Sequence, residues 1–426
     1  MRKCVYGLIS VVLAALLAGC NPPPAEDEGG GADGTAKLHG DAEGIKIGVN
    51  LELTGDTATF GQSCLNGIKL ALEEMGPKPV LGKDIILIQD DNQGKGTDAA
   101  NAAKKQVDID KVPLMIGAVA STNSIAISAI AEDKHVPQVT PASTRTDLTL
   151  AGDGTTKKYT FRTCFIDDFQ GDAIAKFCRE DLKAERIAIL YDNGSDYSKG
   201  IYERVKKTFA ELGGTIAAER TYDAKVDNDF RAHLSQIHAS KFDVLVVPGY
   251  YSEVGKIASQ AREIGITQTI VGGDGFDSPK LVEIAGDAIE GAFFTTHFSA
   301  DDPNPTVQAF VSKYKARYNA VPDAMAVLGY DAMNLCADAI KRAGAADPEA
   351  ITKALGETKN FPGVTGNITI NDKHNAVKDV VVLQVKEGKF AMYKTIPAES
   401  PAPAATDSNE PVEMSDAAEQ GESHGA

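Results

Sequence analysis

The chain contains the stretch IKIGVNLELTGDTATFGQSCLNGIKLALEEM at residues 45–75, and this stretch decides the fold class. Its first part is a short apolar run bounded by turn residues, which predicts a buried strand over 45–53. Apolar residues then recur at helical spacing, which predicts a helix over 61–75. A strand followed directly by a helix is the repeating unit of an α/β protein with a parallel sheet.

The same alternation continues along the chain. Strands that alternate with helices imply parallel sheets with right-handed crossovers, and two such runs imply two doubly wound lobes. A Gly turn within 379–394 predicts a closing hairpin. The further predicted strands lie at 85–90, 113–119, 186–192, 214–222, 242–250 and 293–298, and the further helices at 97–108, 122–134, 198–212, 229–239, 253–264, 305–319 and 324–343.

Length and charge exclude several classes of protein. The 426 residues suit two lobes with appendages rather than one ordinary domain. The net charge of −17 argues against nucleic-acid binding, because a polyanion is bound by clustered Lys and Arg. The same charge argues against electrostatic binding to anionic lipid. Trp is absent, which weakens any carbohydrate interpretation that relies on indole stacking.

The N-terminus has the order of features of an export signal. Arg2 and Lys3 precede the apolar stretch 5–18, which is too short for a transmembrane helix. The stretch ends in LAGC at 17–20, which looks like a bacterial lipobox, so we expect a signal peptide over 1–19 and lipid attachment at Cys20. The alternative is a buried apolar segment that happens to end in Cys.

Two segments lack core-forming residues. Residues 20–43 are rich in Pro, Gly and acidic residues, which predicts a flexible, lipid-anchored tether. Residues 397–426 are rich in Pro, Ala and acidic residues and contain no Lys or Arg, which predicts a disordered acidic tail. One folded body is expected between them.

Motifs for metal binding and catalysis are missing from the sequence. The cysteines beyond the signal show no CxxC spacing and the histidines no HExxH, so no metal and no cofactor are expected. There is also no GxSxG or Walker A motif, and NQGKG at 92–96 follows two Asp that would repel phosphate. An enzyme is therefore not expected. For the cysteines two interpretations stay open: Cys164 and Cys178 pair, or all are buried thiols.

Seven segments together carry a resemblance to a known family. In their order and spacing they resemble the branched-chain amino acid binding proteins, the leucine/isoleucine/valine family of type I periplasmic binding proteins, and the likeness runs over about 44–394. The segments are LTGDTATFGQSCLNGIKLAL (53–72), GAVASTNSIAIS (117–128), TPASTRTDLT (140–149), FRTCFIDDFQG (161–171), YDNGSDYSKG (191–200), PGYYSEVGKIASQAREIG (248–265) and GGDGFDSPKL (272–281).

The resemblance implies two lobes joined by three chain crossings, with a ligand held between them. Lobe 1 would comprise 44–164 and 297–366, and lobe 2 would comprise 165–296 and 367–396. The hinge would run through about Cys164–Asp168, Thr295–His297 and Val364–Ile368.

It also implies a function. The expected protein is a monomer in the cell envelope, periplasmic and anchored to the membrane by lipid. It would capture an amino acid, branched-chain or small and aliphatic, and deliver it to a membrane permease of the ABC type. The alternative is a binding or sensory protein for another small solute, such as a short amide or urea.

Ser121 follows the strand that ends near Val119 and opens a helix. Backbone N–H groups and the dipole at a helix N-terminus favour an anion, and the hydroxyl adds a donor. The alternative is a simple N-cap. The resemblance implies that Ser121 holds the ligand α-carboxylate, while Thr122 in the same turn is assigned no essential contact.

The loop 140–145 offers both donors and acceptors. Ala142 presents a backbone carbonyl, and Thr144 presents a backbone N–H and a hydroxyl, with Ser143 between them. The resemblance implies that this loop contacts the ammonium and carboxylate of the ligand, whereas the alternative is a polar loop with a Pro turn. Arg145 could pair with a carboxylate bidentately or be a solvated surface charge.

Asp274 and three aromatic residues complete the predicted site. Asp274 lies in GGDG, where its carboxylate could accept charge-assisted bonds from an ammonium or serve only the turn. Many relatives have Glu there, which is one methylene longer. The resemblance places Phe60, Tyr197 and Tyr250 in the cleft, although core packing is the commoner role of such residues. Which way Tyr251 faces stays open.

Overall fold

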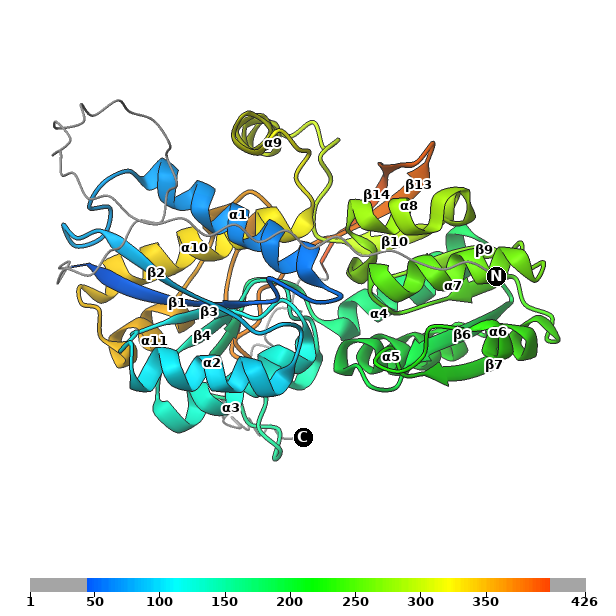
Figure 1. Ribbon diagram of the computed structural model, residues 1–426, viewed down its shortest axis with the longest axis horizontal. Helices are drawn as coiled ribbons and strands as arrows, with labels where there is room; N and C mark the ends of the chain where they lie inside the picture. Colours follow the sequence, from blue (N-terminus) through cyan, green and yellow to red (C-terminus); the bar gives the residue numbers. More distant parts are fainter. Residues whose placement is uncertain (1–43, 399–426) are drawn as a thin grey trace, which may run out of the picture. The chain divides into compact units, whose positions relative to one another are not determined.

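The computed structural model describes residues 44–398 and contains two α/β lobes (Figure 1). The first sheet has five strands in the order β2-β1-β3-β4-β5, and every neighbouring pair is parallel. Helices α1 (Ala58–Met75) and α10 (Ala324–Ala343) lie on one face, and α2 (Gly96–Asp108) and α3 (Ser121–Lys134) lie on the other. The strands are β1 (Ile45–Leu51), β2 (Ile85–Asp91), β3 (Met115–Gly117), β4 (Gln138–Thr140) and β5 (Thr160–Arg162).

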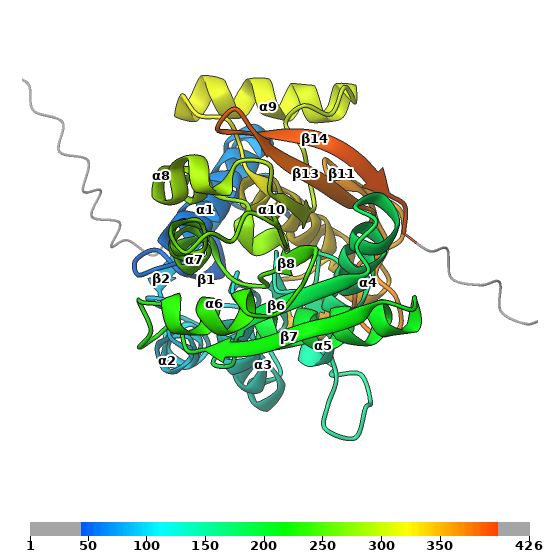
Figure 2. The ribbon, with the colours of Figure 1, turned by 90° about the vertical axis from the view of Figure 1, so that its right-hand side faces the viewer.

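The second sheet has seven strands in the order β14-β13-β10-β9-β8-β6-β7. It is parallel from β10 to β7, whereas β13 pairs antiparallel with both β10 and β14 (Figure 2). The strands are β6 (Arg186–Asp192), β7 (Thr215–Tyr222), β8 (Val244–Val246), β9 (Thr269–Gly272), β10 (Phe293–Thr296), β13 (Val380–Lys386) and β14 (Lys389–Ile396).

Strand β6 shows why this sheet carries helices on both faces. All four of its central side chains, Ile187 to Leu190, are buried, and successive side chains of a strand point to opposite faces. The odd positions pack with α4 (Asp167–Lys176) and α5 (Asp196–Glu211). The even positions pack with the helices of the other face, which are α6 (Arg231–His238), α7 (Tyr251–Glu263) and α8 (Pro279–Ala285). A strand buried on both faces reads as a continuous apolar run, as RIAILYD does.

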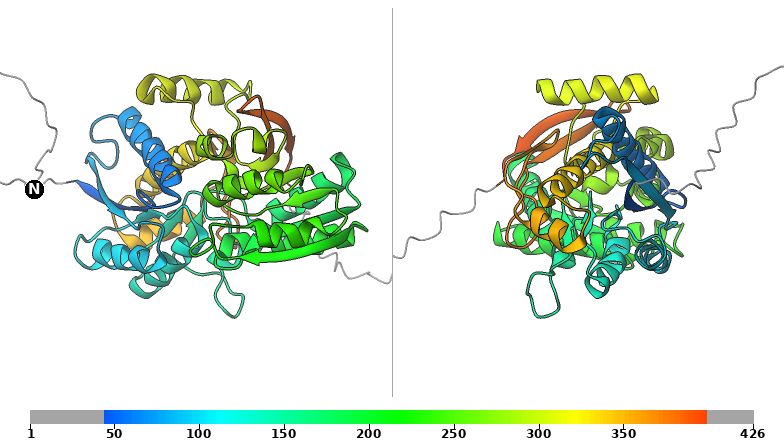
Figure 3. Two further views of the ribbon diagram at one scale, coloured as in Figure 1. Left: turned by 45° about the vertical axis from the view of Figure 1, so that its right-hand side comes forward. Right: turned by 90° about the vertical axis from the view of Figure 1, so that its left-hand side faces the viewer.

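The remaining elements complete lobe 1. Helix α9 (Pro305–Tyr318) lies outside α1 and is joined to it by the ion pairs Lys313–Glu74 and Arg317–Glu73 (Figure 3). Helix α11 (Pro348–Gly356) packs on α10. The short hairpin of β11 (Phe361–Gly363) and β12 (Gly366–Ile368) follows it.

Between residues 44 and 398 the chain passes between the lobes three times. It leaves β5 for α4 through 163–166 and leaves β10 for α9 through 297–304. The third crossing lies near 377–379, so the predicted boundary at 366/367 is wrong. Residues 369–376 still pack on lobe 1: the Arg162 N–H donates to the His374 carbonyl, and the His374 ring stacks on Phe161. Most of the predicted third hinge segment, Val364–Ile368, lies in the hairpin of β11 and β12.

Several predictions fall outside the described residues: the signal 1–19, Cys20, the tether and, from 399 onward, the acidic tail. Of the two interpretations of the cysteines, the structure favours buried thiols, because Cys64, Cys164, Cys178 and Cys336 are all free and buried. Within 44–398 no helix is both long enough and apolar enough to span a membrane.

Candidate functional site

A small cavity lies between the two lobes. It is found at the carboxyl ends of β3, β4, β8 and β9, which is where ligands sit in open α/β sheets. Six of the eight predicted ligand-binding residues line it, whereas Ser143 and Thr144 are buried in the same loop without lining it. The lining residues are Phe60, Val119, Ser121, Ala142 and Met325 from lobe 1 and Tyr197, Tyr250, Asp274 and Gly275 from lobe 2.

The N-terminus of α3 forms one end of the cavity. Ser121 is the first residue of the helix rather than its cap, and its hydroxyl is left with one long bond of 3.4 Å, accepted from the Arg145 N–H. The preceding turn is held by Glu52, whose buried carboxylate accepts the N–H groups of Val119 and Ala120, each at 3.1 Å. Burial raises the pKa of Glu52, and its hydrogen bonds oppose that rise. Glu52 therefore holds this turn in place, and the first N–H groups of α3, which have no partner within the helix, lie at this end of the cavity.

The loop after β4 is held in a similar way by a buried arginine. Arg162 is fully buried, and its guanidinium donates to the carbonyls of Ser143 at 2.9 Å and Arg145 at 2.8 Å. The hydroxyls of Ser143 and Thr144 are buried without a hydrogen-bond partner within the described chain. Unpaired buried hydroxyls are costly, so a loop that keeps two of them beside a cavity is suited to a polar ligand.

Asp274 occupies the lobe 2 side of the cavity and is only 3% exposed. Its Oδ2 lies 3.0 Å from Nε2 of His297, and its backbone N–H donates to Gln170 at 2.8 Å. Its Oδ1 has no partner among the described residues. A buried carboxylate oxygen without a donor is an acceptor available to a bound cation.

Asp167 is a second unpaired carboxyl that the sequence reasoning did not assign to the site. It begins α4, its N–H donates to the Thr144 carbonyl at 2.7 Å, and neither of its side-chain oxygens has a partner in the described part of the chain. Burial raises the pKa of Asp167 well above its usual range, the neighbouring Thr144 side chain opposes that rise, and the charge of Asp274 adds to it. Its segment, FRTCFIDDFQG, was part of the resemblance, but Asp167 was counted only as a hinge residue.

Aromatic rings form the wall between the two ends. The rings of Tyr197 and Tyr250 stack at 4.9 Å, and Phe60 meets Tyr250 edge-on at 5.9 Å. The Tyr197 hydroxyl accepts the Gly275 N–H at 2.8 Å, which fixes the ring. Tyr251 faces Phe60 as well, at 4.9 Å, so it packs behind the wall rather than lining the cavity.

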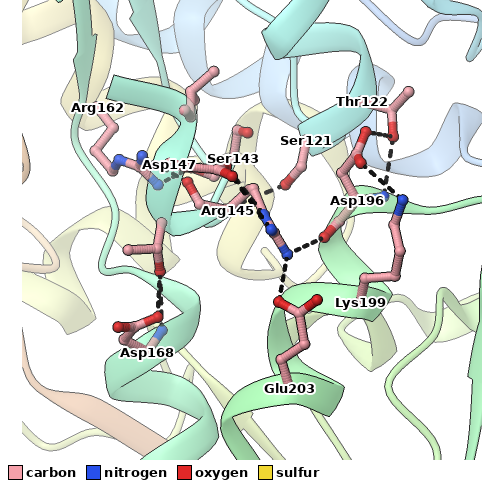
Figure 4. Close-up of polar contacts among 12 residues, drawn as sticks. Ser121, Thr122, Ser143, Arg145, Asp147, Arg162, Asp168, Asp196, Lys199 and Glu203 are labelled. Atoms are coloured by element: carbon pink, nitrogen blue, oxygen red, sulfur yellow. Dashed lines mark hydrogen bonds and ion pairs between the residues drawn. The ribbon is translucent and has the colours of Figure 1, made fainter. Parts of the chain in front are cut away.

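Two polar contacts join the lobes at the rim of the cavity. The Thr122 hydroxyl donates to the Asp196 carboxylate at 2.9 Å and accepts the Asp196 N–H at 3.2 Å. Arg145 pairs with Asp147 on its own lobe and reaches Glu203 and the Asp196 carbonyl on α5 (Figure 4). The expectation that Thr122 makes no essential contact is therefore wrong for the closed lobes, and Arg145 is engaged at the rim rather than in the cavity.

Three lining residues were missed by the sequence reasoning. Val119 and Gly275 lie within the segments 117–128 and 272–281, each within two residues of a predicted site residue, but neither was assigned to the site. Met325 lies in α10, far from the other segments in the chain, and no local pattern distinguishes it from the core residues of that helix. Within 44–398, no cluster of His, Cys, Asp and Glu is suited to hold a metal ion.

Comparisons with known proteins agree with this architecture. The family model described as periplasmic binding protein matches residues 44–389. The Leu/Ile/Val-binding protein BraC3 of Rhizobium johnstonii is 32% identical over 330 residues, which cover 77% of this chain and 88% of the relative. The leucine-, isoleucine-, valine-, threonine-, and alanine-binding protein of Pseudomonas aeruginosa is 31% identical, with 78% and 87% covered.

Solved structures give the same result. The leucine-binding protein LivK of Thermotoga maritima matches with a TM-score of 0.79 and 41% identity over 83% of this chain and 99% of its own. The branched-chain amino acid substrate-binding protein LivJ of Streptococcus pneumoniae, in complex with isoleucine, matches with a TM-score of 0.77 and 35% identity, covering 84% and 100%. With its two doubly wound lobes and the cavity between them, this chain belongs to the periplasmic binding protein family.

Proposed function

We propose that this protein captures a small aliphatic L-amino acid between its lobes and delivers it to an ABC-type membrane permease. The observation that carries the proposal is the pairing of opposite polar ends in one closed cavity. One end has the N-terminus of α3 with Ser121, and the other has the unpaired Oδ1 of Asp274. Family membership makes the protein a solute-binding protein rather than an enzyme.

The polar groups suit a zwitterion. A ligand carboxylate would be stabilised by the helix N-terminus, the Ser121 hydroxyl and the Thr144 hydroxyl of the neighbouring loop. A ligand ammonium would be bound by Asp274 and by the carbonyl of Ala142, with Asp167 as a further acceptor. The two carboxyls, the two hydroxyls and the carbonyl come from both lobes, so the ligand would hold the lobes closed by binding that form more tightly.

The wall of the cavity favours an aliphatic ligand side chain. Phe60, Tyr197 and Tyr250 would cover the ligand side chain, together with Val119 and Met325. Two relatives are described as binding leucine, isoleucine and valine, and one solved relative holds isoleucine, which supports the same ligand class.

Calorimetry tests the ligand class. The protein would be unfolded and refolded to remove any bound solute and then titrated with isoleucine, leucine, valine and alanine. We expect heat and saturable binding with at least one of them, and none with 3-methylbutylamine, which lacks the carboxylate. Binding of a short amide, urea or a sugar, with no heat from any amino acid, would contradict the proposal and favour a different small solute.

The location forms the second part of the proposal. The family is extracytoplasmic, and the LAGC sequence at 17–20 supports a membrane anchor through lipid on Cys20. The closed, loaded monomer would be the form that the permease recognises. Replacing Cys20 with Ala should move the protein from the membrane fraction to the soluble fraction of the envelope. A Cys20→Ala variant that stays in the membrane fraction would contradict the anchor.

A further inference from the structure

His297 follows β10, at the point where the chain crosses from lobe 2 to lobe 1. Its side chain is fully buried and packs on the first of the two other crossings. The ring stacks on Phe165 of the first crossing, with ring centroids 3.7 Å apart. The charge of Lys378, which is buried at the third crossing, also acts on it. His297 therefore lies at the centre of the hinge.

The same ring contacts the proposed ammonium acceptor. Nε2 of His297 lies 3.0 Å from Oδ2 of Asp274, and Nδ1 has no partner among residues 44–398. Because Oδ2 is engaged by the ring, the unpaired Oδ1 is the oxygen that remains for a ligand. A carboxylate oxygen only accepts, so the contact requires a proton on Nε2 of the ring.

The loop that carries Asp274 is attached to the crossing strand at further points. Gln170 accepts the Asp274 N–H at 2.8 Å and the Thr295 hydroxyl at 2.9 Å through the same oxygen. The Thr296 hydroxyl donates to Asp277 at 2.6 Å. Three consecutive residues, Thr295 to His297, thus connect the crossing to the loop 274–277, and His297 is the one that touches the carboxylate itself.

We propose that His297 is a positioning residue for the ligand site: its Nε2–H binds Oδ2 of Asp274 and so directs Oδ1 to the ligand ammonium. The proposal rests on the proposed function, because it requires a ligand with an ammonium group. It also places a contact of the ligand one hydrogen bond away from the hinge, so ligand binding and the position of the second crossing are linked.

The charges around the ring set the expected effect of pH. The charged groups that act on His297 are Asp274 of lobe 2 and Lys378 at the third crossing. Cys164 and Asp167 lie near Asp274, on the side of the first crossing. Burial lowers the pKa of His297, and Asp274 opposes that change. The ring is therefore neutral at pH 7.5 and gains a proton only below its ordinary range. An imidazolium would neutralise Asp274, so affinity for an ammonium ligand should fall as the pH falls.

Two substitutions separate the hydrogen bond from the packing of the ring. His297→Gln keeps an N–H donor near the position of Nε2 but has no group that titrates in this range. His297→Met fills a similar volume without a donor. Binding of isoleucine is measured by calorimetry between pH 5 and 8, with melting curves of each variant as the control for folding.

We expect His297→Met to weaken isoleucine binding at pH 7.5 by roughly tenfold or more, which corresponds to one hydrogen bond to a charged group. His297→Gln should stay within about threefold of the wild type at pH 7.5 and should lose less affinity between pH 7 and 5. The 2-hydroxy analogue of isoleucine, which has no ammonium, should bind His297→Met and the wild type about equally.

Each outcome decides a separate question. If the wild type binds no amino acid, the proposed function is wrong and the inference about His297 is wrong with it. If the wild type binds isoleucine and a folded His297→Met binds it equally well, only the positioning role is wrong. An equal loss for isoleucine and the hydroxy analogue would show a packing role instead. If His297→Met does not fold, an unchanged pH profile in His297→Gln overturns the proposal.

Discussion

The two walls of the cavity are built from different parts of the chain. The polar groups that lobe 1 presents are mainly backbone groups, at the N-terminus of α3 and in the loop around Ala142, and its lining side chains are mostly apolar, as in Phe60 and Met325. Lobe 2 presents side chains, with the Asp274 carboxylate and the stacked rings of Tyr197 and Tyr250. Every residue of a protein has the same backbone groups, and every free amino acid has the same ammonium and carboxylate.

The supports of the two walls differ in the same way. On lobe 1, the buried charges of Glu52 and Arg162 hold backbone groups in place and do not line the cavity. On lobe 2, His297 holds the Asp274 carboxylate itself. A backbone wall changes little when one side chain is removed, whereas a side-chain wall loses the group that makes the contact. Substitutions should therefore have larger effects on lobe 2.

The largest effect is expected from Asp274→Ala. It removes the carboxylate that faces the ammonium in a closed cavity and leaves that charge unpaired, which costs about 2–5 kcal/mol. Amino-acid affinity should fall by roughly 30- to several-thousand-fold in calorimetry. Asp287→Ala, which removes an exposed acid of the same lobe, is the control for charge alone. Wild-type affinity in a folded Asp274→Ala variant would refute the ammonium site and direct attention to the Ala142 carbonyl.

A smaller loss is expected from Ser121→Ala on the lobe 1 wall. The variant loses one hydroxyl, while the N–H groups and the dipole of α3 remain. One hydrogen bond to a charged group is worth about 1.5–3 kcal/mol, which corresponds to roughly 10- to 150-fold in affinity. Ser312→Ala in α9 controls for an exposed serine. A loss equal to that of Asp274→Ala would remove the proposed difference between the walls.

Asp277→Asn tests the next groove along the boundary between the lobes, where Asp277 of lobe 2 and Asp323 of lobe 1 both line the wall. Burial, with the charge of Asp323, raises the pKa of Asp277 to about 8. An acid with a raised pKa binds its proton more tightly in the folded state, so stability falls as the pH rises from about 4 to about 8.

The melting temperature of the wild type should therefore decrease between pH 5 and pH 8. Asp277→Asn should melt about 2 °C or more above the wild type at pH 8, with a smaller difference at pH 5. Some decrease should persist in the variant, because burial also raises the pKa of Glu253 to about 7 and that of Asp323 to about 6. Parallel curves for variant and wild type would contradict the assignment to Asp277.

The smallest effect is expected from Thr122→Ala at the rim. The two hydrogen bonds with Asp196 join the lobes, but the Asp196 carboxylate is also paired with Lys199 and is partly exposed, so we expect their loss to cost only about 0.5–1.5 kcal/mol. Affinity should fall about two- to tenfold, through faster release of the ligand. The loss should disappear in an Asp196→Ala background. If it persists there, Thr122 acts through the cavity and not through the contact between the lobes.

The alternation of strands and helices could be predicted from the sequence, because burial on both faces of a sheet makes each strand a short apolar run. The strand 186–192 and the helix 324–343 have the predicted bounds, and the bounds of most other predicted elements differ by a few residues. The elements that were not predicted are short, as in β5, or carry few apolar residues, as in α4. The third crossing was misplaced because the resemblance gives only approximate positions for the crossings, and the packing of 369–376 on lobe 1 depends on contacts such as that between His374 and Phe161.

The sequence by itself determined the fold class, the family resemblance and the segments that meet at the cavity, because these depend on local pattern and order along the chain. Only the tertiary structure decided which oxygen of Asp274 is unpaired, and that Asp167, Met325 and His297 lie around the site. It also decided that Thr122 and Arg145 join the lobes. Those facts depend on contacts between residues far apart in the chain, and burial gives them their energy, since an unpaired polar atom is costly only where water is excluded.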